Sequence, residues 1–284
     1  MTNGSIINLI SGILDTLPKS EQKVGRTILN DPDFAVKASV QSLARKAETS
    51  AAAVIRFSKS LNLDSFPELK RQLSMELATP NRTGYYDIEP GESFDSIREK
   101  LVSNVNQTTQ DTASQLKEDA IIQVCAEMEQ AETIYAYGVG ASWLIAEDIA
   151  QKWLRAGKNV FLSQDPHVLA MAFSSGKENS LFFAISNSGE TSQVLELANE
   201  AKQSGLKVVS LTRIGNNKLK SISDLVLETS RAPEAEMRST ATSSRQAQLL
   251  VIDILFYYFA SKQYDEMITH IKKSREATNR FREK

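Results

Sequence analysis

The chain has 284 residues, of which 41% are hydrophobic and 24% are charged, and its net charge is −2, as in an ordinary globular protein. No apolar stretch approaches the roughly 18 residues of a membrane span, and the N-terminus lacks the basic-then-apolar layout of a secretory signal. The single cysteine, Cys125, excludes an internal disulfide, and its apolar helical surroundings predict a buried thiol. We therefore expect a cytoplasmic protein without a membrane partner.

The distribution of charge and the histidine content bear on possible partners and metal sites. Residues 1–80 hold ten Lys or Arg and eight Asp or Glu, whereas residues 81–284 hold 23 and 27, so the N-terminal part is slightly basic. The two histidines, His167 and His270, lie far apart in the sequence and offer little for a zinc or iron site. We expect no metal and no cofactor.

The first 78 residues carry apolar positions at helical spacing, punctuated by Pro18 and Asp31-Pro32. The predicted helices cover 5–16, 20–30, 34–38, 40–47, 50–61 and 65–77. Residues 79–92 contain two prolines and two glycines without an amphipathic repeat, which is typical of a linker.

Beyond residue 93 the pattern changes. A helical stretch over 93–130, with a break near 117–119, is followed by short β-branched and aromatic runs that alternate with helices. The predicted strands are 133–137, 159–162, 181–185, 208–212 and 225–229, and the predicted helices between and after them are 142–156, 166–173, 191–204 and 242–260. This alternation predicts a doubly wound, five-stranded parallel sheet flanked by helices. The predicted organisation is an all-α domain at 1–78, a linker at 79–92 and an α/β domain at 93–284.

Residues 40–61 have the spacing of a helix-turn-helix, with the turn at 48–50. On its second helix one face is apolar and is formed by Val54, Phe57 and Leu61. The opposite face is small and basic, and such a face suits contact with base edges and phosphates. The candidate DNA-binding residues are Thr49, Ser50, Ala51, Ala52, Arg56 and Lys59. An ordinary amphipathic helix with a solvated basic face is the alternative, because the usual turn glycine is missing.

The motif Ser50-x-Ala52-Ala53-Val54-x-Arg56-Phe57-x-Lys59-x-Leu61, followed by Phe66-x-Glu68-Leu69-Lys70, resembles the N-terminal domain of the RpiR transcription factors. Two glycines of the family pattern are replaced here by Asn62 and Ser65. Asparagine tolerates the left-handed conformation of a helix C-cap, so the first replacement is mild. The resemblance implies operator DNA as a partner.

A hydroxyl-rich loop at 186–191 follows the apolar run 181–185 and precedes a helix. Free N–H groups and the positive end of the helix dipole attract an anion there, and Ser186, Ser188 and Thr191 add neutral donors. A phosphate monoester is the natural ligand. A serine nucleophile is disfavoured because the Gly-x-Ser-x-Gly pattern is absent.

A second loop, at 138–142, carries Gly138 and Gly140 before Ser142. It lacks the third glycine of a dinucleotide fingerprint, where Trp143 stands, so a nicotinamide site is disfavoured. The carboxyl ends of parallel strands meet at one edge, so both loops are expected to face the same ligand.

Together the two loops resemble the SIS (sugar isomerase) domain, a phosphosugar-binding module, over residues 110–255. The resemblance implies that the 186–191 hydroxyls hold the phosphate, that the 138–142 loop lines the sugar side, and that the stretch 234–245 adds ligand contacts. The implied ligand-binding residues are Gly138, Gly140, Ser142, Ser186, Asn187, Ser188, Gly189, Thr191, Glu236, Arg238 and Ser239.

A helical DNA-binding domain joined to a phosphosugar module predicts a ligand-responsive transcriptional regulator, assembled as a homodimer or homotetramer, with no catalytic residues. A sugar-phosphate isomerase or etherase is the alternative, with Glu234 and Glu236 as candidate bases. The stretches 165–168 and 238–248 resemble the MurR-type branch of the family. That resemblance implies N-acetylmuramic acid 6-phosphate as the effector, with glucosamine-type phosphates as the second choice.

Overall fold

The computed structural model describes residues 6–78, 91–176, 179–232 and 241–280. Two compact units divide the chain, with the main break between Gln115 and Leu116. The predicted linker at 79–92 lies almost wholly outside the described residues, so the domain boundaries at 78 and 93 stay a prediction. Within the described ranges, every helix is too short or too polar to cross a lipid bilayer.

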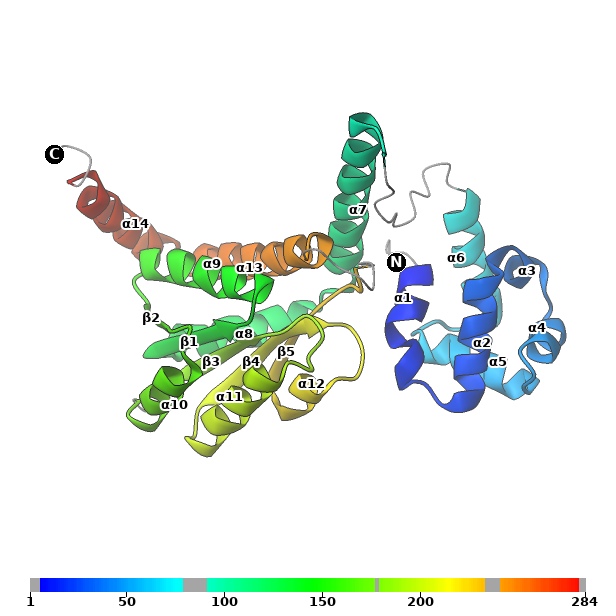
Figure 1. Cartoon of the computed structure of the whole chain (residues 1–284), viewed down its shortest axis with the longest axis horizontal. Helices are drawn as coiled ribbons and strands as arrows, with labels where there is room; N and C mark the ends of the chain where they lie inside the picture. Colours follow the sequence, from blue (N-terminus) through cyan, green and yellow to red (C-terminus); the bar gives the residue numbers. More distant parts are fainter. Residues whose placement is uncertain (1–5, 79–90, 177–178, 233–240, 281–284) are drawn as a thin grey trace. The chain divides into compact units, whose positions relative to one another are not determined.

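The N-terminal unit is helical (Figure 1). Its elements are α1 (Ile6–Ile13), a 3-10 turn (Leu14–Thr16), α2 (Lys19–Asn30), α3 (Pro32–Lys37), α4 (Val40–Lys46), α5 (Ala51–Ser60), α6 (Phe66–Ala78) and α7 (Phe94–Gln115). Helices α1 to α6 share one apolar core around Val24, Leu43, Phe57 and Leu69, which are fully buried. The helices predicted from periodicity are therefore present, with bounds close to those expected.

Side-chain caps fix where several of these helices begin. The Asp31 carboxylate accepts a hydrogen bond from the N–H of Phe34, and the Ser39 and Ser50 hydroxyls accept from the N–H groups three residues on, at 3.1 and 3.2 Å. Ser65 does the same for α6 at 3.3 Å. Each cap supplies a side-chain acceptor to an N–H of the first turn, where the regular hydrogen bonds of the helix do not reach.

Helices α4 and α5 form the predicted helix-turn-helix without a glycine in the turn. Glu48 takes the left-handed conformation instead, at φ 49°. Asn62, after α5, does the same at φ 58°, as expected for an asparagine at a helix C-terminus. The missing turn glycine therefore costs backbone strain at Glu48 but does not prevent the motif.

The second unit is built on a five-stranded, all-parallel sheet in the order β2-β1-β3-β4-β5, as predicted. The strands are β1 (Thr133–Gly138), β2 (Asn159–Leu162), β3 (Leu181–Ile185), β4 (Lys207–Arg213) and β5 (Leu225–Thr229). The helices are α8 (Glu118–Gln130), α9 (Ala141–Arg155), α10 (Pro166–Ser174), α11 (Ser192–Gln203), α12 (Lys218–Ile222), α13 (Ser243–Lys262) and α14 (Tyr264–Asn279). The short helix α12 was not predicted, and α14 begins beyond the final predicted helix, 242–260.

Helices cover both faces of this sheet (Figure 1). Alternate residues of each strand point to opposite faces, so Ile134 and Phe183 pack with α8, α9 and α13, whereas Tyr135 and Phe182 pack with α10, α11 and α12. Cys125 lies in the first of these cores, where burial raises the pKa of its thiol to about 12. The prediction of a buried thiol is confirmed.

Candidate functional site

The candidate site lies at the carboxyl ends of β1 and β3. These strands are neighbours in the sheet. After β1 the chain continues to β2 on one side of the pair, and after β3 it continues to β4 on the other side, so the loops that follow β1 and β3 diverge. Doubly wound sheets bind ligands at such a switch point. The fold therefore brings the two sequence-predicted loops together.

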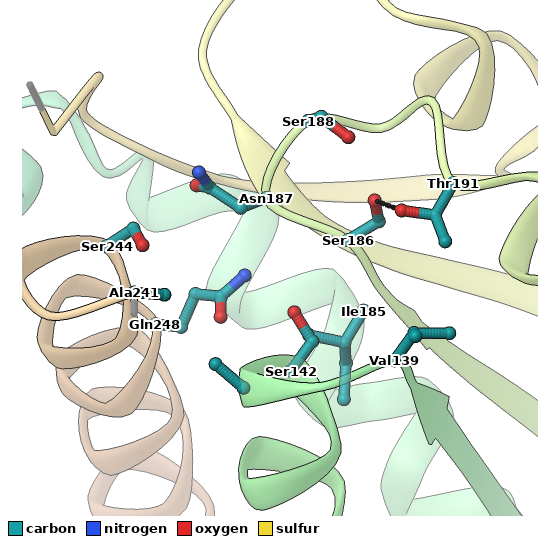
Figure 2. Close-up of a pocket in the computed structure, with 11 residues that line it drawn as sticks. Val139, Ser142, Ile185, Ser186, Asn187, Ser188, Thr191, Ala241, Ser244 and Gln248 are labelled. Carbon is teal, nitrogen blue, oxygen red and sulfur yellow. Dashed lines mark hydrogen bonds between the residues drawn. The ribbon is translucent and has the colours of Figure 1, made fainter. Parts of the chain in front are cut away.

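Hydrogen bonds within the 186–191 loop give it a fixed shape (Figure 2). The Ser186 and Thr191 hydroxyl oxygens lie 3.0 Å apart, and Ser186 Oγ also accepts from the N–H of Gly189 at 3.1 Å. Ser188 Oγ accepts from the N–H of Glu190 at 3.2 Å. The main chain of the loop is anchored to β4, since the N–H of Ser186 donates to the carbonyl of Leu211.

Two glycines of these loops lie so close to neighbouring residues that a side chain would not fit. Gly189 has φ +68°, and a Cβ there would lie 2.0 Å from Oδ1 of Asn217, the residue that caps α12. A Cβ on Gly138 would lie 2.6 Å from the main-chain oxygen of Ser142, where α9 begins. Only glycine fits at either position.

A cavity of about 270 Å³ opens between the loops and α13 (Figure 2). Five predicted ligand residues line it, namely Ser142, Ser186, Asn187, Ser188 and Thr191. The other lining residues are Val139, Ala141, Ile185, Ala241, Ser244 and Gln248. Gly138, Gly140 and Gly189 shape the loops without lining the cavity, and Glu236, Arg238 and Ser239 lie outside the described residues.

Ser244 lies in the stretch 234–245 that was predicted to add ligand contacts but was not singled out, and Gln248 lies beyond that stretch. They lie one turn apart on α13, and both are 2% exposed. They continue the buried stripe that Val251 and Leu255 form further along the helix. Two polar residues on an otherwise apolar buried stripe are the signal that identifies them.

Helices α9, α11 and α13 all begin at this cavity, and no side chain in the described part of the chain caps them. By contrast α10 and α12, which pack on the same sheet, are capped by Asp165 and Asn217. Helix α8 also lacks such a cap, but none of its residues lines the cavity. The first N–H groups of α11 are therefore available to an anion, whereas at α9 the N–H groups of Ser142 and Trp143 already donate to the carbonyls of Val139 and Gly140.

Two side-chain amides at the cavity are left without a hydrogen-bond partner among the described residues. Asn187 Oδ1 and Gln248 Nε2 are both buried from solvent. A buried polar atom without a partner costs roughly 1–3 kcal/mol, so a ligand that pairs with both atoms would recover that free energy. The amide oxygen accepts and the amide N–H donates, so together they match a polar group that does both.

The charged residue of the loop does not face the cavity. Glu190 is exposed, accepts from the N–H of Lys218 at 2.9 Å and pairs with Lys218 Nζ at 2.9 Å. These contacts hold the pKa of the Glu190 carboxyl below its usual value. No titratable residue lines the cavity in the described ranges, and His167, at the start of α10, is exposed.

The predicted DNA-binding residues gather at one end and one face of α5. Ala52, Arg56 and Lys59 are exposed, whereas Val54 and Phe57 on the opposite face are fully buried, as predicted. Ser50 is exposed and caps the helix, and Thr49 and Ala51 beside it are half-buried. The arrangement matches a reading helix with a small N-terminal end.

Comparison with known proteins agrees with both halves of the chain. The helix-turn-helix domain model of the rpiR family matches residues 4–80, and the SIS domain model matches residues 127–258. The uncharacterized HTH-type transcriptional regulator YbbH of Bacillus subtilis is 38% identical over 274 residues, which cover 96% of this chain and 97% of YbbH. The chain belongs to the RpiR family of helix-turn-helix transcriptional regulators.

Two further regulators or solved structures align with this chain over nearly its full length. The HTH-type transcriptional regulator HexR of Escherichia coli is 29% identical over 280 residues, covering 98% of this chain and 96% of HexR. The NanR protein of Vibrio vulnificus, solved in complex with ManNAc-6P, is 25% identical with a TM-score of 0.62, covering 97% of this chain and 98% of NanR. The prediction of an RpiR-type regulator with a C-terminal SIS domain is confirmed.

Proposed function

We propose that this RpiR-family chain binds operator DNA through α5 and senses a phosphorylated amino sugar in the cavity of its SIS domain. The preferred effector is N-acetylmuramic acid 6-phosphate, as the resemblance to the MurR-type branch implies, with glucosamine-type phosphates second. The regulated genes would then serve sugar catabolism. The observation that carries the proposal is a hydroxyl-lined cavity on which α9, α11 and α13 converge, none of them capped by a side chain of the described residues.

The 186–191 loop is the proposed phosphate site. Its hydroxyls and the first N–H groups of α11 offer donors without a positive side chain, so the empty site has no charge to neutralise. The NanR structure with ManNAc-6P supports a phosphorylated amino sugar as the class of ligand.

The sugar side of the cavity is proposed to lie toward Ser142, Asn187 and Gln248. An amino sugar that is N-acetylated carries an N–H donor and a carbonyl acceptor on one group, which matches the two unpaired amides. Gly138, Gly140 and Gly189 would contribute by shaping the loops. The predicted contacts from Glu236, Arg238 and Ser239 remain part of the proposal.

Sensing, without chemical transformation of the sugar, is the proposed use of this cavity. Isomerisation needs a base beside a carbon-bound proton, and no described lining residue is titratable. To test this part, each sugar phosphate that binds is incubated with the protein, and the NMR spectrum of the sugar phosphate is recorded before and after. An unchanged spectrum is expected, whereas a new sugar phosphate would contradict it.

The proposed output is a change in operator affinity through a homodimer or homotetramer. A dimer presents two reading helices to two half-sites, so a ligand acts by favouring one arrangement of the pair over another. Equal affinity of the effector for both arrangements would produce no response.

A thermal-shift screen tests the ligand class. The panel comprises N-acetylmuramic acid 6-phosphate, N-acetylglucosamine 6-phosphate, glucosamine 6-phosphate and glucose 6-phosphate, each beside its unphosphorylated sugar. A ligand at 100 times its Kd adds roughly 2.7 kcal/mol of stability, so the effector should raise Tm clearly. Equal shifts from the unphosphorylated sugars, or no shift from any member, would overturn the proposal.

A further inference from the structure

A buried carboxylate in the N-terminal unit lies directly behind the reading helix. Glu21, in the first turn of α2, has a side chain that is only 4% exposed. Its Oε2 accepts from the Ser60 hydroxyl at 2.8 Å, and its Oε1 accepts from Nε of Arg56 at 3.4 Å. Both partners belong to α5, one turn apart, so a single carboxylate ties α2 to the reading helix at two points.

Packing around this contact leaves little room for α5 to move. One turn after Glu21 on α2, a Cβ on Gly25 would lie 3.1 Å from the ring of Phe57 and 2.6 Å from Leu14. Gly25 and Glu21 are both buried on the face of α2 that meets α5. A buried carboxylate is costly unless it is paired and hydrogen-bonded, which makes this an unusual way to pack two helices.

The other end of the contact faces solvent. The Arg56 side chain is 56% exposed although its Nε is held by Glu21. The guanidinium is a rigid planar fork, so the contact at Nε restrains the direction in which the two terminal Nη groups point. Lys59, one turn away on the same exposed face, is a flexible point charge of the kind that suits phosphate.

We infer that Glu21 is a positioning residue that presents Arg56 for bidentate recognition of a guanine base in the operator. Two outward N–H groups of restrained direction match the O6 and N7 acceptors of guanine in the major groove. Lys59 would hold the backbone without reading sequence. This inference rests on the proposed DNA binding by α5 and adds which residue reads a base and what orients it.

Selection from a random duplex DNA library by the full-length protein, followed by sequencing, tests the inference. The wild-type chain should prefer guanine at one position of each half-site by roughly 5- to 150-fold, the value of a good bidentate pair. Glu21→Met removes the carboxylate but keeps a helix-forming apolar side chain of similar size. It should lose that preference while the other selected positions stay unchanged.

Three further variants separate positioning from general stability. Arg56→Ala should lose the same guanine preference, and Glu21→Gln, which keeps the shape and a weaker acceptor, should retain part of it. Ser60→Ala removes the second contact of Glu21 and should leave the preference intact. Selected sequences from Glu21→Met that match the wild type at every position would overturn the inference, whereas failure of the wild type to select any sequence would contradict DNA binding itself.

Discussion

The N-termini of the helices around the helix-turn-helix differ from those of the helices at the cavity in how their N–H groups are paired. In the N-terminal unit, α3, α4, α5 and α6 each begin with a side chain that accepts a hydrogen bond from the first turn. At the cavity, α9, α11 and α13 begin without such a cap among the described residues. Helices α3 to α6 thus have a first-turn N–H paired within the chain, whereas the first turn of α11 keeps N–H donors that a ligand can use. The difference predicts opposite responses to mutation in the two regions.

The largest effect is expected at Gly189. Gly189→Ala places a methyl group against Asn217 at a left-handed φ and should lower the free energy of unfolding by roughly 2–3 kcal/mol. Because the 186–191 loop is displaced, ligand-induced stabilisation should vanish in a thermal-shift assay. Gly205→Ala provides the control, since it has φ +79° and open space. A loop that still binds ligand normally would show that its geometry is not what the ligand reads.

Ser188→Ala should weaken phosphosugar binding while leaving the fold intact. One hydrogen bond to a charged phosphate is worth roughly 1.5–3 kcal/mol, or about 10- to 150-fold in affinity by calorimetry. Ser204→Ala, at the far end of α11, is the matched control and should bind as the wild type does. Equal affinities for Ser188→Ala and Ser204→Ala would place the phosphate elsewhere.

Gln248→Leu should separate stability from binding. Removing a buried amide whose Nε2 has no partner in the described residues should raise the stability of the ligand-free protein by about 1 kcal/mol. Ligand affinity should fall by about tenfold in the same variant. Gln246→Leu, on the same helix but outside the cavity lining, should leave ligand affinity unchanged. Denaturant unfolding and calorimetry measure the two effects, and loss of stability in Gln248→Leu would contradict the account.

Substituting the N-cap residue should affect the stability of α5 more than that of α13. Ser50→Ala removes the side-chain acceptor of the Ala53 N–H, which keeps only the Ser50 carbonyl, and should cost about 1 kcal/mol of stability. Thr242→Ala, at the corresponding position of α13, removes no cap and should cost less than about 0.5 kcal/mol. Equal losses in urea unfolding would mean that the pocket helices are capped in solution.

The smallest effect is expected in the helix-turn-helix turn. Glu48→Gly relieves the left-handed strain at φ 49° but loosens the unfolded chain, so a net gain of roughly 0.5 kcal/mol is expected. Glu48→Ala keeps the strain and should show no gain in Tm. A gain in Glu48→Ala as large as that in Glu48→Gly would show that charge, and not backbone strain, limits this turn.

Periodicity was sufficient to predict the sheet and nearly every helix, because most elements carry a strong apolar pattern over their whole length. Helix α12 was missed since its five residues are too few to show a period, and its position depends on the Asn217 cap. The loops at 138–142 and 186–191 were predictable as one site, because parallel strands deliver their carboxyl ends to the same edge.

Contacts between distant residues could not be predicted in the same way. Glu21 and Arg56 are 35 residues apart in the sequence, and nothing local pairs them. Gln248 joins the cavity only because α13 packs beside the loops, although its place on the buried stripe hinted at an inward direction. For Glu21 and Gln248 alike, the signal in the sequence is a polar residue on an otherwise apolar helix stripe.

The most direct test of the whole account is operator affinity measured against effector concentration. The duplex obtained by selection, labelled for fluorescence anisotropy, is titrated with full-length protein at increasing N-acetylmuramic acid 6-phosphate. A change of roughly 5- to 150-fold is expected for the wild type, and Ser188→Ala should need about 10- to 150-fold more effector to show the same change. Arg56→Ala should bind effector normally but bind the duplex poorly. Unchanged operator affinity for a wild-type protein shown by calorimetry to be saturated with effector would contradict the central claim.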